Sequence, residues 1–341
     1  MSDQASPSIT PERIMQFSGG FGPPLVIETA LRLDIFDILD DAPKDIRQLV
    51  SDTNTSARGL SALLNALVGL GLLTKNIAEQ YELTPESSAF LVTGKPTFHG
   101  AFFLLTSEAM LPHWGRLTEI VKTGRPTHRV NIEADWTEFF LRFVENIFPI
   151  HLPAARCLAE TLDITSMAAP VTVLDLAAGS GVWSIALAQQ SPHVSVTAVD
   201  WPAVIQITRK VSAREGVASR YRYIGADLLE ADFGDGYIIA TLGHILHSEG
   251  EVRSRALLRK AFDALAPGGR VAIAEILVDA DRRGPPPALM FAINMLVHTE
   301  HGGTFSLDEI STWLRDAGFD GIRTIDAPGL APRLIVATKP Q

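Results

Sequence analysis

The stretch VTVLDLAAGSGVWSIALAQ, residues 171–189, decides the fold of this chain. It begins with an apolar, β-branched run that is typical of a buried strand and that contains one acid, Asp175. The small residues 177–181 follow, and the apolar spacing of a helix then begins at Val182. In such a strand, tight turn and helix, the backbone approaches a ligand closely and the helix dipole favours a negative group. The stretch therefore predicts a nucleotide-like ligand.

Two ligands compete for this turn. A dinucleotide-binding turn follows the pattern G-x-G-x-x-G, in which the third glycine allows the helix to pack tightly, but Ser184 stands at that place here. An acid before the turn is unexpected for a negatively charged pyrophosphate and suits a ligand with a positive amino or sulfonium centre. In this feature the turn resembles motif I of methyltransferases that use S-adenosylmethionine (SAM). We therefore expect SAM rather than NAD, in contact with Asp175, Ala177, Gly179 and Gly181.

Two further acids follow the next predicted strands. The second strand ends at Asp200, about twenty residues past the glycines, where a carboxylate can accept hydrogen bonds from both ribose hydroxyls. Trp201 comes next and is a candidate to lie against the adenine face, with ordinary core packing as the alternative. The third strand leads to Asp227 and Leu228, which we expect near the adenine amine, although a surface turn would also place an acid there.

Composition excludes several classes of protein. The chain has 341 residues, of which 46% are hydrophobic, enough for one large or two ordinary domains. Its single cysteine, Cys157, allows no intrachain disulfide, and together with a polar start that lacks an apolar signal core this favours the cytoplasm. No apolar run approaches the length needed to cross a bilayer. The net charge of −10 argues against nucleic acid as the main partner, since phosphate binding needs basic patches.

Residues 1–96 have the outline of a winged helix. Helical patterns at 12–39, 46–50 and 60–73 precede an alternating stretch at 74–84 that predicts a small hairpin. Many winged helices bind DNA, so a ligand-responsive DNA-binding regulator is one hypothesis. Charge opposes it, because the first 100 residues hold 7 Lys or Arg against 12 Asp or Glu. The last helix is apolar all round, which predicts burial in its own core or against another subunit.

Residues 97–168 continue as helices rich in aromatic side chains, and we expect them to form a connector between two domains. Core and dimer packing accounts for most of these aromatics. A few side chains are expected to line an apolar pocket for a small-molecule substrate, and the candidates are Trp114, Phe143 and Asn146.

Residues 169–341 alternate strand and helix patterns, which predicts a parallel sheet with helices on both faces. Two late strands, 321–325 and 333–337, lie close enough in sequence to form an antiparallel hairpin. A parallel sheet closed by such a hairpin is expected of the SAM-methyltransferase fold and not of a dinucleotide-binding domain.

Two histidines and a carboxylate are expected at one edge of this sheet, since ligands of open α/β sheets bind at the carboxyl ends of the strands. The fourth strand leads into His244 and His247, and the fifth ends at Glu275. Methyl transfer to a hydroxyl requires removal of the hydroxyl proton, and a histidine beside a carboxylate titrates in the useful range. We expect His247 to be the base and Glu275 to orient it. The alternative is that Glu275, at the end of its strand, only caps the N-terminus of a helix.

These motifs together resemble the SAM-dependent O-methyltransferase family of plants and bacteria, and the likeness covers nearly the whole chain. It is carried by LDLAAGSG (174–181), AVDWP (198–202), GADLL (225–229), ILHSEGE (245–251), LAPGGRVAIAE (265–275), MLVHTEHGG (295–303) and AGF (317–319). The resemblance implies an α/β fold, with a Rossmann-like, mostly parallel sheet preceded by an all-helical winged-helix dimerisation domain. It also implies a domain-exchanged homodimer, a SAM donor and a small-molecule acceptor of secondary metabolism. By position, His247 matches the family's base, Glu275 its partner acid, and Asp200 and Asp227 its cofactor acids.

The chain departs from the family pattern at three places. Residues 247–249 are H-S-E where the family often has H-D-W, and Ala177 replaces a common glycine. Thr304 stands where plant members usually place a second acid, which leaves an acid–base pair instead of a set of three. Glu300 is the nearest candidate to substitute for that acid.

The chain has more histidines near the expected site than one proton transfer requires. His244 and His247 are three positions apart, and His298 and His301 have the same spacing. In our first interpretation no metal is bound, and His244, His298 and Glu300 contact the acceptor. In the alternative, two or three of these histidines bind zinc or iron with open positions for a bidentate substrate. A branch of the family methylates the β-carbon of α-keto acids in this way, because the metal favours the enol. The sequence leaves the acceptor and its acceptor atom open.

Overall fold

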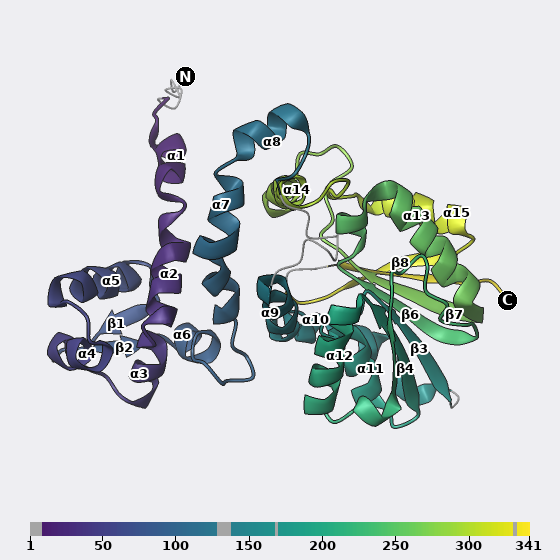
Figure 1. Cartoon of the computed structure of the whole chain (residues 1–341), viewed down its shortest axis with the longest axis horizontal. Coiled ribbons are helices and arrows are strands. Elements are labelled where there is room, and N and C mark those ends of the chain that lie inside the picture. The colour runs from purple at the N-terminus through teal and green to yellow at the C-terminus, as the bar shows by residue number, and fades with distance from the viewer. Residues whose placement is uncertain (1–8, 128–137, 168–169, 330–332) are drawn as a thin grey trace, which may run out of the picture. The chain divides into compact units, whose positions relative to one another are not determined.

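The computed structural model describes residues 9–127, 138–167, 170–329 and 333–341, and it divides the chain into two compact units, Met1–Met110 and Leu111–Gln341 (Figure 1). This division assigns residues 97–110 of the expected connector to the first unit and the rest of its described residues to the second. The boundary expected between residues 168 and 169 lies outside the described residues.

The first unit packs short helices and one hairpin around an apolar core. Its elements are α1 (Glu12–Met15), η1 (Gln16–Gly19), α2 (Gly22–Arg32), α3 (Ile35–Asp41), α4 (Ile46–Thr53), α5 (Ala57–Gly69), β1 (Leu73–Lys75), β2 (Tyr81–Leu83), α6 (Pro85–Phe90), η2 (Gly100–Leu105) and η3 (Thr106–Met110). Ser56 caps α5 by accepting a hydrogen bond from the backbone N–H of Gly59 at 3.1 Å. One face of α5 is buried, through Leu60, Leu64 and Leu67. The antiparallel pairing of β1 and β2 confirms the predicted hairpin, so this region is mainly but not entirely helical.

The second unit contains a seven-stranded sheet in the order β5-β4-β3-β6-β7-β9-β8. Its strands are β3 (Val171–Leu176), β4 (Val194–Asp200), β5 (Tyr221–Gly225), β6 (Tyr237–Gly243), β7 (Leu265–Ala274), β8 (Asp320–Asp326) and β9 (Arg333–Thr338). The first five of these are parallel, whereas β9 is antiparallel to both β7 and β8. The predicted parallel sheet with a closing antiparallel hairpin is therefore confirmed.

Helices cover both faces of this sheet (Figure 1). The helices and short turns of the unit are α7 (Leu111–Trp114), α8 (Leu117–Thr123), α9 (Glu138–Asn146), α10 (Phe148–Thr161), η5 (Ile164–Ser166), α11 (Val182–Gln190), α12 (Pro202–Arg214), η6 (Ala218–Arg220), α13 (Leu246–Ala264), α14 (Pro286–His298) and α15 (Leu307–Ala317). Because side chains alternate along a strand, Val171 and Val173 of β3 pack with α10, α11 and α12, whereas Leu174 and Leu176 pack with α13 and α15.

The strand order reverses at β3, which lies between β4 and β6. In open α/β sheets ligands bind outside the carboxyl ends of the strands at such a switch point. The turn after β3 therefore lies where the fold itself favours a ligand.

Two boundaries differ from the sequence-based expectation. The strand β7 already begins at Leu265, because Leu265 pairs with Tyr237 and the regular register resumes only at Arg270. The helix α13 begins at Leu246 and not at Val252, because a distant carboxylate satisfies its first backbone N–H groups, as described below. In the part of the chain that the structure describes, no helix has the length and apolar character that crossing a membrane requires.

Candidate active site

The turn after β3 has an unusual backbone conformation. Ala177, Gly179 and Gly181 have φ angles of 55°, 55° and 78°, all in the left-handed region. A Cβ on Gly181 would lie 3.1 Å from Ile185 and 3.2 Å from Thr208, so the turn packs too closely there for a side chain. The alanine that replaces the family's common glycine thus adopts a glycine conformation. The result is a cradle of small residues, which would let a nucleoside ligand approach the backbone closely.

Asp200 lies at the end of β4, beside this cradle. Its Oδ2 accepts a hydrogen bond from the Gly179 N–H at 2.8 Å, and its Oδ1 accepts one from the Trp201 N–H at 2.7 Å. Burial raises the pKa of Asp200 to about 7 despite these two bonds, and the charges of Asp175 and Glu249 add to the rise. A buried carboxylate of this kind gains most from further hydrogen-bond donors, so its chemistry fits the two hydroxyls of a ribose.

Asp175 lies beneath the turn rather than on its surface, and its expected contact with the cofactor stays a prediction. Its side chain is fully buried, and it accepts hydrogen bonds from the hydroxyls of Thr241, at 2.7 Å, and Ser184. Tyr221 donates in turn to Ser184 at 3.0 Å. Burial raises the pKa of Asp175 to about 6, and the two hydroxyls oppose that rise. Asp175 therefore ties β3 to α11 and β6 and supports the turn from below.

Asp227 follows β5 and is held at both oxygens. Its Oδ1 accepts a hydrogen bond from the Leu229 N–H at 2.8 Å, and its Oδ2 accepts one from Arg253 of α13, also at 2.8 Å. The neighbouring Leu228 is buried, and Trp201 is half-buried against the core beneath α12. Arg253 carries no local sequence signal, because its contact joins residues 26 positions apart.

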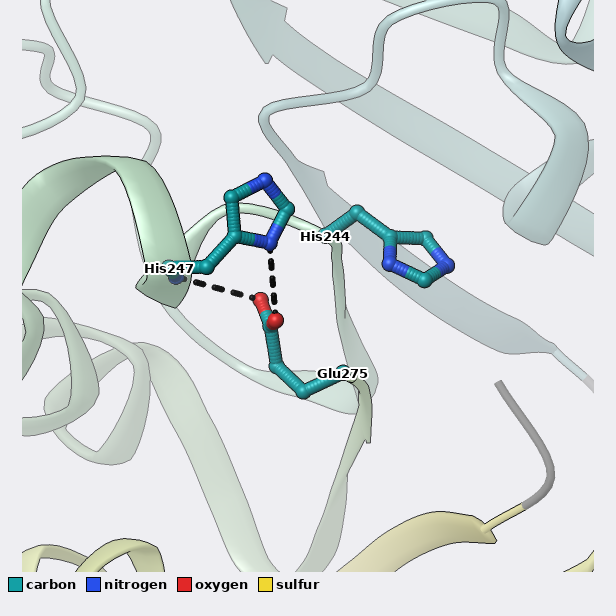
Figure 2. Close-up of side chains that lie close together, drawn as sticks. All are labelled: His244, His247 and Glu275. Atoms are coloured by element: carbon teal, nitrogen blue, oxygen red, sulfur yellow. Dashed lines mark hydrogen bonds and ion pairs between the residues drawn. The ribbon is translucent and has the colours of Figure 1, made fainter. Parts of the chain in front are cut away.

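His247 and Glu275 form a close pair, as predicted (Figure 2). The Nδ1 of His247 lies 2.8 Å from Oε2 of Glu275, whose side chain is only 3% exposed. Burial alone would raise the pKa of Glu275, but the charge of His247 and the hydrogen bond from it outweigh burial and lower it. An ionised Glu275 accepts a hydrogen bond from the Nδ1–H of His247. The other ring nitrogen, Nε2, points away from Glu275 in Figure 2 and is therefore the one that can take up a proton.

Glu275 also caps the N-terminus of a helix, which was the alternative to its role as the partner of His247. Its Oε1 accepts hydrogen bonds from the backbone N–H groups of Leu246, at 2.9 Å, and His247, at 3.4 Å. These groups belong to the first turn of α13, which has no side-chain cap of its own. One carboxylate therefore caps the helix and orients the histidine that the helix carries.

The segment after α14 packs directly against the turn that carries His247. The N–H of Gly303 donates to the carbonyl oxygen of His247 at 2.8 Å. A Cβ on Gly302 would overlap that same oxygen, and a Cβ on Gly250 would overlap the backbone of His301. Gly250 also has a φ of 73° and produces a kink in α13. These glycines permit a backbone-to-backbone contact that fixes the position of His247.

His244 lies beside the pair and belongs to a stack of rings. Its ring centroid is 4.3 Å from that of His151 of α10, which in turn lies 6.2 Å from Trp183. Burial lowers the pKa of His244 well below its usual range and that of His151 to about 4, so both rings are neutral. The Nε2 of His244 is enclosed and has no hydrogen-bond partner among the described residues. His151 is a site residue that the sequence did not reveal, since a lone histidine in an apolar helix gives no signal.

The predicted acceptor-binding residues lie on the helices α7, α9 and α14 and on two segments outside helices, with His244 after β6 and Glu300 after α14. Trp114 of α7 donates to Asn294 of α14 at 3.3 Å, and the His298 ring lies 5.5 Å from that of His113. Phe291, one helical turn before Asn294, has its ring edge-on to His247 with centroids 4.9 Å apart, a contact that the sequence did not predict.

Phe143 and Asn146 are half-buried at the end of α9, where Phe143 packs against the core. Glu300 and His301 are exposed.

Three side chains lie close enough together to hold one metal ion. The ligand atoms of His244, His247 and Glu275 lie within 4.8 Å of one another, and this is the one such group in the described parts of the chain. His298 and His301, the other two histidines of the metal alternative, are not members of it. Two of these three side chains, His247 and Glu275, are already hydrogen-bonded to each other.

Comparisons with known proteins are consistent with this geometry. A family model described as the O-methyltransferase domain matches residues 150–320. A second, described as the O-methyltransferase dimerisation domain, matches residues 15–93. Together they span most of both compact units.

Individual relatives match over nearly the whole chain. It is 31% identical over 319 residues to the 3-hydroxy-5-methyl-1-naphthoate 3-O-methyltransferase of Streptomyces sahachiroi, covering 92% of this chain and 91% of that protein. It is 28% identical over 339 residues to the tetracenomycin polyketide synthesis 8-O-methyl transferase TcmO of Streptomyces glaucescens, covering 97% of each. The solved structure of PigF with SAH (S-adenosylhomocysteine) superposes with a TM-score of 0.83 at 25% identity, over 97% of this chain and 100% of that one.

Proposed function

This chain belongs to the SAM-dependent O-methyltransferases that have an N-terminal dimerisation domain, and from that premise we propose that it methylates a hydroxyl of a small aromatic acceptor, with His247 as the general base. The observation that carries the assignment of the base is the contact of 2.8 Å between His247 Nδ1 and the buried carboxylate of Glu275. An aromatic acceptor is supported by the names of the relatives, which methylate a hydroxynaphthoate and a tetracenomycin polyketide.

SAM, when bound, supplies a methyl group on a positively charged sulfur. The backbone of residues 177–181 would support the cofactor, and Asp200 would accept hydrogen bonds from its ribose hydroxyls. Asp227 and Leu228 would hold the adenine. Asp175 holds the turn in place from beneath, through Ser184 and Thr241.

The acceptor hydroxyl must lose its proton as its oxygen takes the methyl group. His247 accepts that proton at Nε2, because Nδ1 is engaged by Glu275. The imidazolium that forms is stabilised by the ionised Glu275 beside it. Phe291 restricts the ring of His247 from one side, and Trp114, Asn294 and His298 line the approach of the acceptor.

The acceptor class is tested by transfer of radiolabelled methyl groups from SAM to phenols, hydroxylated naphthoates, hydroxy-quinones and α-keto acids, each with and without a chelator. We expect product from a hydroxylated aromatic compound and no effect of the chelator. Methylation of an α-keto acid alone, abolished by the chelator, would overturn the proposal in favour of a metal-assisted carbon methyltransferase.

We also propose that the protein acts as a homodimer. The dimerisation model matches residues 15–93. Near the start of that region Ile14, Met15, Phe17 and Phe21 are each more than half exposed. Apolar side chains gathered in this way are typical of a surface that a second subunit covers.

A further inference from the structure

One arginine joins two acids on the side of the site that we assign to the nucleoside. Arg253 and Glu249 stand one turn apart in α13, and Arg253 Nε donates to Glu249 Oε2. The Nη2 of the same guanidinium donates to Asp227 Oδ2 at 2.8 Å, across from α13 to the segment after β5. The side chains of Glu249 and Asp227 are only 10% and 13% exposed, whereas that of Arg253 is 38% exposed. A single cation therefore compensates two nearly buried carboxylates.

The geometry of Asp227 depends on this contact. Its other oxygen is occupied by the backbone N–H of Leu229, so the two bonds together fix the orientation of the carboxylate. A second cation of the same helix, Lys260, donates to the carbonyl oxygens of Leu228 and Leu229 at 3.0 and 2.8 Å. The helix α13 thus holds this segment by its backbone through Lys260 and by its acidic side chain through Arg253.

Removing Arg253 would take the ion pair away from two nearly buried carboxylates. Glu249 is near enough to Asp200 for its charge to disfavour ionisation of that acid. Asp227 and Glu249 both lose their ion pair with Arg253, and the charge of Lys260 then acts on Asp227 alone of the two. Breaking one side of a nearly buried ion pair usually costs more than the pair contributes, because an uncompensated charge remains. Both acids would then move or take up protons.

We propose that Arg253 is a positioning residue for the adenosyl part of SAM, which it serves by holding Asp227 and Glu249 in one arrangement. This rests on the proposed placement of the nucleoside at Asp200 and Asp227. Arg253 lies in the same helix as His247, so the helix that carries the base also organises the nucleoside side of the site. The planar guanidinium bonds both carboxylates at once through different nitrogens, which a lysine ammonium cannot match.

The test compares Arg253→Gln and Arg253→Lys with the control Arg255→Gln. Arg255 lies two residues further along α13 and pairs with the exposed acids Glu251 and Asp316. Calorimetry would measure the Kd of each variant for SAM and for S-adenosylhomocysteine, which lacks the sulfonium charge but has the same nucleoside. We expect Arg253→Gln to weaken both ligands equally, by about tenfold or more, and Arg253→Lys to recover part of the loss. Arg255→Gln should bind both ligands as the wild type does.

Kinetics provide a readout that general destabilisation would not reproduce. Arg253→Gln should raise the KM for SAM and leave kcat at saturating SAM, and the KM for the acceptor, within about twofold. Equal wild-type affinity of Arg253→Gln for both ligands would overturn the inference. So would a loss confined to SAM, since the residue would then act on the sulfonium and not on the nucleoside.

SAM binding by the wild type and by Asp200→Asn separates this inference from the proposed function. If the wild type fails to bind SAM, the proposed function itself is wrong. If the wild type binds SAM and Asp200→Asn binds it more weakly, while Arg253→Gln binds normally, only the role of Arg253 is refuted. Should Arg253→Gln fold poorly, the double variant Glu249→Gln/Arg253→Gln removes one unpaired charge. It should still bind both ligands about tenfold more weakly, and wild-type binding by it would contradict the proposal.

Discussion

His247 and Glu275 meet because two parallel strands end side by side. Gly243 at the end of β6 pairs with Ala274 at the end of β7, so the residues that follow leave the sheet at the same edge. Glu275 then serves both the backbone and the ring of the turn that contains His247. A single residue thus sets the start of a helix and the orientation of its imidazole.

Ala177 is the residue at which backbone strain should be measurable. A non-glycine residue in the left-handed region costs about 1–2 kcal/mol, whereas the extra freedom of a glycine in the unfolded chain costs about 0.4–1 kcal/mol. Ala177→Gly should therefore stabilise the protein by about 0.5–1 kcal/mol in thermal unfolding, with SAM affinity retained. A loss of stability would show that the packing of the Ala177 methyl group against the core outweighs any strain of its φ of 55°.

Asp200 predicts a pH dependence of cofactor binding. The pKa of this acid is raised to about 7 by burial, and ribose hydroxyls that donate to it favour its ionised form. Binding should therefore lower this pKa and release about half a proton at pH 7, and affinity should fall as the pH drops below that value.

The release is measured from the dependence of the binding enthalpy on the ionisation enthalpy of the buffer. Asp200→Asn is the control, since an amide has no proton to lose. The same release from this variant would assign the titration to another group, such as Asp175 with its pKa of about 6.

The predictable part of the site consists of residues at the carboxyl ends of strands or within a few positions of them. Asp200, His247 and Glu275 each come after an apolar run whose strand character is evident in the sequence, so the topology alone brings them to one edge. Arg253, His151 and Phe291 could not be found in this way. Their contacts depend on how α13, α10 and α14 pack, and nothing local in their sequence surroundings indicates a partner.

At the scale of elements, α13 and the segment after α14 form one packed unit around the base. The sequence predicted the α/β alternation and the closing hairpin because periodicity and the length of the connections determine them. It placed the start of α13 six residues late, since the cap of this helix is supplied by Glu275, 29 residues beyond Leu246.

The contact between these two elements should be sensitive to one methyl group. A Cβ on Gly302 would overlap the carbonyl oxygen of His247 and the hydroxyl of Thr299, whereas one on Gly303 would meet nothing within 4 Å. Gly302→Ala should displace the turn that carries His247 and lower kcat about tenfold or more, with little change in the Kd for SAM. Gly303→Ala is the matched control, and steady-state kinetics with calorimetry would compare the two. Equal activity of both variants would show that the close approach does not position the base.

In the whole molecule, the match to the dimerisation model and the candidate site fall in different compact units. The first unit matches a dimerisation model and presents exposed apolar side chains, while the second holds every group of the candidate site. Composition could not indicate which apolar side chains of the first unit remain exposed, because exposure depends on how the helices pack.

The dimer is tested by replacing one of these side chains with a charge. Phe17 is 76% exposed and packs against no core cluster of the described residues, so Phe17→Glu should leave the fold of the chain intact. Multi-angle light scattering should give about twice the chain mass for the wild type and a shift towards the monomer for the variant. A monomeric wild type would contradict the proposed homodimer.

The most direct test of the central claim is the effect of His247→Ala on methyl transfer measured alongside SAM binding in the same preparation. Loss of a general base typically lowers kcat by a factor of about 10²–10⁴, and the SAM affinity should be unchanged because His247 lies on the acceptor side of the site. The account predicts this separation of a large loss in kcat from an intact Kd. Wild-type turnover by His247→Ala would contradict it, because the proton of the acceptor would then have another destination.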